Sequence, residues 1–174
     1  MQHGSPRFRR LNSSLATIHK PIEQSNLDYN VAVLTETENE LRTTYIHNNA
    51  SKYSQKTAHI TFADDYVFVA LQTPTDTVAA LAGIAGVELV CTVADHYYGS
   101  PTKVRVKRHP YCNSLTVQKT LEALASTGAI EMSDASVHDL FSGANAVFTM
   151  NSGVGLEALL HGRPVVVTGE CDYS

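Results

Sequence analysis

Residues 66–71 read YVFVAL, a nearly continuous apolar run with the β-branched and aromatic bias of a strand that is buried on both faces. Gln72 follows this run, and residues 73–76 (TPTD) carry the proline and polar side chains of a turn. Residues 78–84 then place Ala, Leu and Val at spacings that a helix accepts. The stretch therefore predicts a strand, a loop and a helix, which is the repeating unit of a parallel sheet.

The same alternation of strands and helices continues toward the C-terminus. Strands are predicted at residues 104–107, 146–149 and 164–168, and helices at residues 115–126 and 137–144. Ser136 precedes the second of these helices with Asp139 three residues on, which is close to a capping box. This order predicts an α/β fold, a Rossmann-like parallel sheet with helices on both faces, in which ligands bind at the carboxyl ends of the strands.

Composition limits the size and class of the protein. With 174 residues, 43% of them hydrophobic, the chain is long enough for one core with an extension and short for two domains. The net charge of -4 argues against bulk nucleic-acid binding, and no apolar run is long enough to span a bilayer. The three cysteines lack CxxC spacing, so we expect reduced thiols in a cytosolic protein. No HxxxH, DxD or Cys–His cluster implies a bound metal ion.

The first third of the chain is polar and weakly patterned. Residues 1–20 contain basic residues and no acidic one, which fits either a solvated end or a contact with anionic lipid. Within residues 23–56 only VAVL at 31–34 suggests a strand. We therefore expect residues 1–60 to form a partly disordered N-terminal extension or remnant, and residues 61–174 to form the folded domain.

Polar side chains follow three of the predicted strands, at the ends where ligands collect. They are Gln72 and Asp76, then Lys107, Arg108 and His109, and finally Asn151, Ser152 and Gly153. In the third group an apolar strand ends near Met150 and turns into a helix, an arrangement that directs backbone N–H groups toward an anion. Glu157, early in that helix, is placed to accept hydrogen bonds from ribose hydroxyls. Together these segments predict a nucleotide-sugar site.

The basic group after the second strand has two interpretations. His109 is placed to donate a hydrogen bond to a phosphate oxygen, with Lys107 and Arg108 offsetting the negative charge of a leaving group. The alternative is a histidine at a strand end beside two surface cations. Strand alternation places Arg105 and Lys107 on the same face, so we expect at most one of these two cations to reach the site if that face is covered.

From about residue 66 to residue 173 the chain resembles the nucleotide-binding half of the capsule polysaccharide biosynthesis proteins. This bacterial family includes the β-Kdo transferases that act with a CMP-Kdo donor. The resemblance rests on the order and spacing of LQ at 71–72 with Asp76, VKRHP at 106–110, Ser133 with HDL at 138–140, NSGVGLEAL at 151–159, GRPVV at 162–166, Gly169, and DY at 172–173.

The resemblance implies the C-terminal, donor-binding half of a GT-B glycosyltransferase, with relatives continuing beyond both ends of this chain. The implied function is transfer of Kdo from CMP-Kdo to a capsule-type glycan or glycolipid acceptor, with no further cofactor. Asp76 is implied as the nucleophile of a retaining double displacement, although it is equally a helix N-cap candidate. Gln72 would order a substrate hydroxyl or close the turn, and Ser133 would contact the base or the ribose. His138, by contrast, is expected to be a surface residue.

Alternatives from other classes stay open. One is a non-catalytic nucleotide-binding or partner-docking module derived from such an enzyme. An NAD-dependent oxidoreductase is disfavoured, because no GxGxxG motif follows the first strand. The resemblance further implies a cytoplasmic location, peripheral association with the inner membrane, and an acceptor-binding half supplied by a separate subunit or a second copy.

Overall fold

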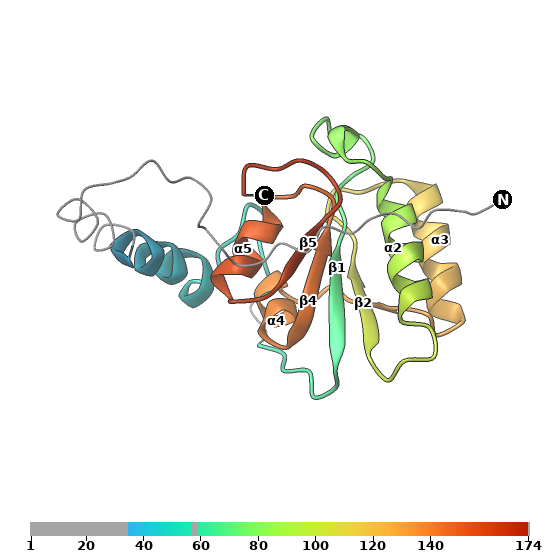
Figure 1. The fold of residues 1–174 in the computed structure, drawn as a ribbon, viewed down its shortest axis with the longest axis horizontal. Coiled ribbons are helices and arrows are strands. Elements are labelled where there is room, and N and C mark those ends of the chain that lie inside the picture. Colours follow the sequence, from blue (N-terminus) through green and yellow to red (C-terminus); the bar gives the residue numbers. More distant parts are fainter. Residues whose placement is uncertain (1–34, 57–58, 174) are drawn as a thin grey trace, which may run out of the picture.

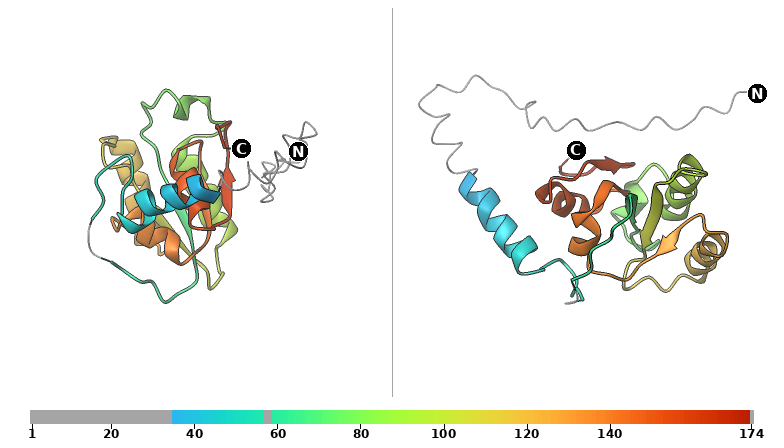
Figure 2. Two further views of the ribbon diagram at one scale, coloured as in Figure 1. Left: turned by 90° about the vertical axis from the view of Figure 1, so that its left-hand side faces the viewer. Right: turned by 90° about the horizontal axis from the view of Figure 1, so that it is seen from below.

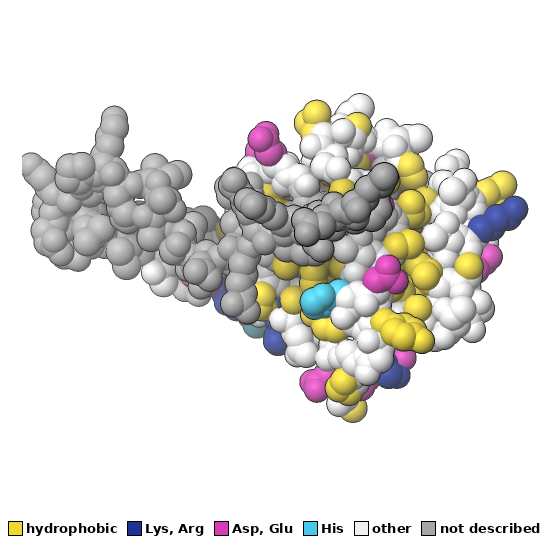
Figure 3. Space-filling view, turned by 45° about the vertical axis from the view of Figure 1, so that its right-hand side comes forward, with side chains coloured by type: hydrophobic (Ala, Val, Ile, Leu, Met, Phe, Trp, Pro, Cys, Tyr) yellow, Lys and Arg dark blue, Asp and Glu magenta, His cyan; other side chains and the backbone are white. Residues whose placement is uncertain are grey.

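The computed structural model describes residues 35–56 and 59–173. The predictions for the basic N-terminus and for the strand at residues 31–34 lie outside this part of the chain. Among the described residues no helix combines the length and the apolar character needed to cross a bilayer. Lysine and arginine side chains are dispersed over the face of the domain shown in Figure 3.

A five-stranded parallel sheet with the order β3-β2-β1-β4-β5 forms the centre of the domain (Figure 1). The strands are β1 (Tyr66–Ala70), β2 (Lys103–Lys107), β3 (Glu131–Met132), β4 (Ala144–Thr149) and β5 (Val165–Val167). The chain builds outward from β1 to β3 and then returns to place β4 on the other side of β1. This reversal creates a switch point between β1 and β4, where the loops at the carboxyl ends diverge and leave a crevice.

Helices cover both faces of the sheet, so the Rossmann-like α/β fold is confirmed. On one face lie α2 (Gly86–His96) and α3 (Leu115–Ser126); on the other lie α4 (Val137–Ser142) and α5 (Val154–Leu160). The alternation along β1 explains both layers. Val67 and Val69 pack under α2 and α3, whereas Tyr66 and Phe68 pack under α4 and α5. All five residues of β1 are buried, as expected for the central strand of a covered parallel sheet.

The predicted helix at residues 78–84 is wrong in position. Only a 3₁₀ turn, η2 (Ala79–Leu81), forms there, and the helix that covers the sheet is α2, which begins at Gly86. Ala82 turns to an extended conformation and pairs with Gly169, a contact remote in sequence that the helical spacing does not reveal. The predicted helix at 137–144 also ends early, because Ala144 already belongs to β4.

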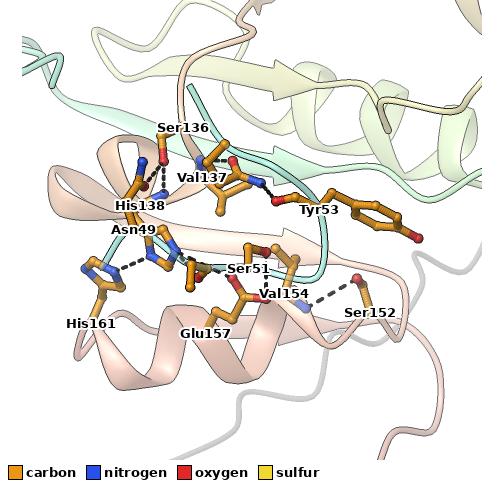
Figure 4. Close-up of polar contacts among 12 residues, drawn as sticks. Asn49, Ser51, Tyr53, Ser136, Val137, His138, Ser152, Val154, Glu157 and His161 are labelled. Atoms are coloured by element: carbon orange, nitrogen blue, oxygen red, sulfur yellow. Dashed lines mark hydrogen bonds and ion pairs between the residues drawn. The ribbon is translucent and has the colours of Figure 1, made fainter. Parts of the chain in front are cut away.

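The segment before the domain is more ordered than its composition indicates. Residues 35–42 are α-helical and continue into a π-helical turn, η1 (Thr43–His47), which projects away from the sheet beside α5 (Figure 2). After Asn49 the chain passes beside α4 and α5, where Asn49 contacts Ser136 and Ser51 contacts Glu157 (Figure 4).

Strand β2 carries two cations on the same face, Arg105 and Lys107, which lie toward opposite ends of the strand. Arg105 lies toward the amino end, where it donates two hydrogen bonds to Asp64 at 2.8 and 2.9 Å and packs between the rings of Phe62 and Tyr66. Lys107 lies at the carboxyl end on the same face, where it contacts the loop before α4. Only Lys107 of this pair therefore reaches the predicted site, and Arg105 holds the opposite end of the sheet together.

Candidate functional site

A cleft opens at the carboxyl ends of β1, β2 and β4, at the switch point of the sheet. The predicted site residues that line it are Gln72, Asp76, Lys107, Arg108, His109, Asn151, Ser152, Gly153 and Glu157. Ser133 does not line it. Residues 51–55, which sequence reasoning assigned to a polar extension, form part of its wall.

Gln72 and Asn151 bond to each other across the base of the cleft. The Gln72 Nε2 donates to Asn151 Oδ1 at 3.1 Å, and the Asn151 backbone N–H donates to Gln72 Oε1 at 3.2 Å. Asn151 Nδ2 also donates to the Val78 carbonyl oxygen at 2.6 Å. Both side chains are buried, so these mutual bonds satisfy groups that would otherwise be costly to bury. The pair ties β1 to β4 and positions the loop that carries Asp76.

Asp76 lies in that loop, at the edge of the cleft. Its Oδ1 accepts a hydrogen bond from the Val78 N–H at 2.8 Å, so the carboxylate stabilises the turn that leads into η2. The side chain is half-buried and its charge acts on His109 across the cleft. Asp76 thus uses Oδ1 to stabilise the turn and also lines the cleft. The two roles, in the turn and toward a bound ligand, are therefore compatible.

Lys107 carries a half-buried positive charge into the cleft. Its Nζ donates to the Ala135 carbonyl oxygen and lies 3.5 Å from Gln55 Oε1. No carboxylate oxygen of residues 35–56 and 59–173 lies within 4.0 Å of this nitrogen. Burial lowers the pKa of Lys107, as expected for a cation removed from water without a counter-ion. Such a group favours an anionic ligand. Arg108 extends instead to Gln118 of α3, at 3.3 Å.

His109 presents a hydrogen-bond donor to the cleft. Its Nδ1 accepts from the Tyr111 backbone N–H at 3.2 Å, which assigns the neutral ring as the tautomer with its proton on Nε2. Burial lowers the pKa of His109, opposed in part by the Asp76 carboxylate. The ring is therefore neutral at pH 7 and offers an N–H group rather than a full charge.

The loop before α4 uses its serines locally. Ser133 Oγ accepts from the Ala135 N–H at 3.3 Å, and Ser136 Oγ accepts from the His138 N–H at 3.2 Å at the start of α4. Asp139 accepts from the Ile60 N–H at 3.2 Å, so it anchors the incoming chain rather than completing a capping box. The role of Ser133 toward a nucleotide stays a prediction.

The turn between β4 and α5 places Glu157 against the cleft. Ser152 Oγ accepts from the Val154 N–H at 3.3 Å, which satisfies one backbone donor of the first turn. Glu157 Oε1 accepts from Ser51 Oγ at 3.0 Å, while its buried Oε2 has no hydrogen-bond partner in the described part of the chain. Burial raises the pKa of Glu157. Oε2 lies 3.9 Å from His138 Nε2, on the side of the carboxylate away from Ser51. The Glu157 side chain as a whole lines the cleft, where a carboxylate can accept a hydrogen bond from a ligand hydroxyl.

Two histidines lie behind Glu157, the buried His138 and the half-buried His161. The expectation that His138 is a surface residue is wrong: its side chain is buried because Asn49 and Ala50 cover the start of α4. His138 Nε2 lies 2.7 Å from the Ala50 carbonyl oxygen and its Nδ1 lies 3.0 Å from His161 Nε2 (Figure 4). Because a carbonyl only accepts, His138 carries its proton on Nε2 and accepts the His161 N–H at Nδ1. Both rings are thus assigned as neutral.

Because His138 and His161 are neutral in the folded chain, we expect acid to lower the free energy of unfolding. Burial lowers the pKa of His161 to about 4, against an ordinary value of 6.5, so the unfolded chain binds the proton more readily. The stabilisation is complete above pH 6.5 and is lost as the pH falls toward 4. For a fully buried ring the effect would reach about 3 kcal/mol, and partial exposure reduces it to about 1–2 kcal/mol. Between pH 7.5 and 4.5, urea unfolding should show a smaller loss of stability in His161→Gln than in the original chain.

The exposed His96, at the end of α2, provides the matched control for that experiment. His96→Gln should retain the acid sensitivity of the original chain, because solvent already surrounds this ring. Equal losses in the original chain and in His161→Gln would contradict the assignment of His161 as a buried neutral group. The lowered pKa values of His138 and His109 act in the same direction, so His161→Gln should remove only part of the sensitivity.

Comparison with known proteins finds one matching family and several solved structures with a similar fold. A family model described as capsule polysaccharide biosynthesis protein matches residues 17–174. Two solved structures from Thermosulfurimonas dismutans are similar in fold: KpsC, beta Kdo 2,7 transferase (TM-score 0.57, 20% identity) and KpsC, beta Kdo 2,4 transferase (TM-score 0.59, 21% identity). They align with 82% and 81% of this chain, which spans 44% and 46% of theirs. UDP-GlcNAc 2-epimerase from Methanocaldococcus jannaschii aligns with 62% of this chain and 30% of its own length, at 16% identity and a TM-score of 0.46. No functionally curated protein matches the sequence.

Within residues 35–56 and 59–173, no group of three or more His, Cys, Asp and Glu side chains is arranged to hold a metal ion.

Proposed function

Because the chain belongs to the capsule polysaccharide biosynthesis protein family, we propose that its domain is the donor-binding half of a GT-B glycosyltransferase, with CMP-Kdo as the donor. One observation carries the proposal: the half-buried Lys107 has no carboxylate partner in the described structure and lines the same cleft as the His109 ring and the Glu157 carboxylate. A cation, a donor and an acceptor in one cleft match the phosphate and hydroxyl groups of a nucleotide sugar. The similar fold of two enzymes named as beta Kdo transferases supports this choice.

The proposed roles follow from the chemistry of each group. Lys107 and the His109 N–H group bind the phosphate and stabilise the charge that develops as CMP leaves. Glu157 accepts hydrogen bonds from the ribose. The Asp76 carboxylate attacks the anomeric carbon, forms an ester bond to the sugar and releases CMP. An acceptor hydroxyl then displaces Asp76, loses its proton and leaves the sugar with its original configuration.

The acceptor in this proposal is a capsule-type glycan or glycolipid. It would be bound from the opposite side of the cleft by a second half of the enzyme, in the same polypeptide, in a separate subunit or in another copy of this chain. Such glycans imply action at the cytoplasmic face of the inner membrane, with the protein associated peripherally.

A second candidate is a nucleotide-binding or partner-docking module without catalytic activity. The groups that we assign to nucleotide binding all line this one cleft, so binding of a nucleotide does not require the acceptor-binding half. Both candidates predict nucleotide binding, and only the first predicts sugar transfer from CMP-Kdo once the acceptor-binding half is supplied.

The proposal predicts selective binding of CMP. In calorimetric titrations the chain should bind CMP more tightly than UMP or NADH. Glu157→Ala and His109→Ala should each weaken CMP binding about 10-fold, since each removes one hydrogen bond to a charged or strongly polar group. His96→Ala, in an exposed position of α2, should leave the affinity unchanged. A folded chain that binds none of the three nucleotides would refute the proposed site.

A further inference from the structure

Residues 51–56 follow Asn49 and Ala50, and residues 51–55 line one side of the cleft; we name residues 51–56 the strap. Their side chains alternate: Ser51, Tyr53 and Gln55 are half-buried, whereas Lys52, Ser54 and Lys56 are exposed. A period of two is typical of an extended segment that lies against a surface. The strap thus turns one set of side chains toward the domain and the other toward solvent, although all six side chains carry a polar group.

Each inward side chain of the strap contacts a different residue of the candidate site. Ser51 Oγ donates to Glu157 Oε1 at 3.0 Å. The ring of Tyr53 packs edge-to-face with His109, with ring centroids 4.6 Å apart. Figure 4 shows Ser51 beside Glu157, with Tyr53 on the same segment of chain and its ring directed away from Glu157.

The third inward side chain, Gln55, contacts Lys107. Its Oε1 lies 3.5 Å from Lys107 Nζ and accepts from the Val137 N–H at 3.0 Å. Its Nε2 donates to the Tyr53 carbonyl oxygen at 2.8 Å, which fixes the conformation of the strap itself. The three side chains therefore meet the three groups to which we assign phosphate and ribose binding.

Independent contacts fix the strap to the domain on both sides of these residues. Before it, Ser136 Oγ donates to Asn49 Oδ1 at 2.6 Å, and the Ala50 carbonyl oxygen accepts from His138 at 2.7 Å. At its end, Lys56 pairs with Asp134. Asn49 Nδ2 also donates to the Lys56 carbonyl oxygen at 3.0 Å, which joins the two ends. The position of the strap is thus determined by contacts outside the cleft.

The strap leaves the cleft open. The lining of the cleft includes residues 51–55 of the strap, the loop that carries Asp76 and the turn at Ser152. The strap is therefore a wall of this space rather than its contents. A ligand that enters would meet the strap on one side and the strand ends on the other.

We propose that Ser51, Tyr53 and Gln55 are positioning residues of the donor site, and that the strap holds Glu157, His109 and Lys107 in the orientation that the donor requires. The identity of the donor rests on the proposed function; the contacts of the strap do not. Without the strap, Glu157 would lose its hydrogen-bond donor, Lys107 would lose an acceptor, and His109 would face water. Binding groups held in advance by neighbouring side chains lose less entropy when the ligand binds.

The decisive variant is Tyr53→Leu, compared with Tyr53→Phe and with Tyr98→Leu. Phenylalanine keeps the ring against His109, and Tyr98 is an 87% exposed tyrosine in the turn after α2. In calorimetric titrations Tyr53→Leu should bind CMP about 10-fold more weakly than the original chain, in line with an aromatic pair and the order that it imposes on His109. Tyr53→Phe and Tyr98→Leu should bind CMP normally. Ser51→Ala is a second variant and should weaken binding about 5-fold through Glu157.

A second readout needs no ligand. In a proton NMR titration of the His109 imidazole, Tyr53→Leu should raise the pKa of His109 toward 6.5, because removal of the ring exposes the imidazole to water. Tyr53→Phe should leave this pKa in place. The charged groups that act on His109, Asp76 and Lys52, are the same in all these variants.

The outcomes separate the two hypotheses. If the original chain binds no CMP, the proposed function fails, while the His109 titration still tests the strap. Unchanged His109 titration in Tyr53→Leu would overturn the positioning role. So would tighter binding of CMP by Tyr53→Leu or Ser51→Ala, because that result would identify the strap as an obstacle to the ligand.

Discussion

Replacing Phe141 by alanine is expected to lower the free energy of unfolding by about 3–5 kcal/mol. Phe141 is fully buried in α4, where its ring packs against Phe68 of β1 at 5.7 Å and against His161 at 5.3 Å. Alanine would remove these contacts and leave a cavity between the sheet and the α4–α5 layer. Because small domains are stable by about 5–15 kcal/mol in total, the variant should lose a large fraction of its stability. Urea unfolding followed by circular dichroism measures the loss.

A leucine in α3 provides the matched comparison. Leu115 is 69% exposed, so Leu115→Ala should change the free energy of unfolding by less than about 0.5 kcal/mol. Phe141→Leu, which keeps most of the buried volume, should lose less than Phe141→Ala. A loss below about 1.5 kcal/mol for Phe141→Ala would show that the α4–α5 layer contributes little to the stability of this core.

Four of the five strands were predictable because each combines buried apolar residues with a polar turn, whereas β3, of two residues, Glu131–Met132, has no such pattern and was not predicted. The run at 66–71 becomes the fully buried β1, and the helix predicted at 115–126 begins and ends where the structure places α3. The α2 region was misread because the local spacing of apolar residues fits helix both before and after Gly83. A pairing between Ala82 and Gly169 interrupts the helical pattern before α2 begins, and that pairing depends on chain 87 residues away.

The site was predictable in part, for a related reason. Parallel strands bring their carboxyl ends together, so Gln72, Lys107 and Asn151 could be assigned to one cleft from their positions after strands. Their partners could not be assigned. That Asn151 bonds to Gln72, and that His138 is buried by Asn49 and Ala50, depends on contacts between distant segments.

The strap was missed because its signal is weak in sequence. Residues 51–56 read SKYSQK, which contains no aliphatic side chain and resembles a solvated linker. Only the burial of every second residue reveals its role, and that alternation involves Ser, Tyr and Gln rather than the valines and leucines that mark a strand. Hydrophobic periodicity detects strands that bury apolar faces, whereas the strap is held by hydrogen bonds and aromatic contacts.

The largest expected effect on ligand binding comes from Lys107→Met. Methionine fills a similar volume without the charge, so CMP affinity should fall about 30- to 100-fold, as expected when a partly desolvated contact to phosphate is lost. The stability of the chain, by contrast, should increase. Because Lys107 is half-buried with no carboxylate within 4.0 Å in the described structure, its removal should raise the free energy of unfolding by about 1 kcal/mol.

Calorimetry with CMP and urea unfolding of the same preparation would measure both effects. Lys119→Met is the control, since Lys119 is exposed on α3 and its replacement should alter neither quantity by much. The combination of lost binding and retained or increased stability distinguishes a group that serves a ligand from one that serves the fold. If Lys107→Met instead destabilised the chain and bound CMP normally, the contacts of Lys107 with Ala135 and Gln55 would be its whole function, and the anion site would have to lie elsewhere in the cleft.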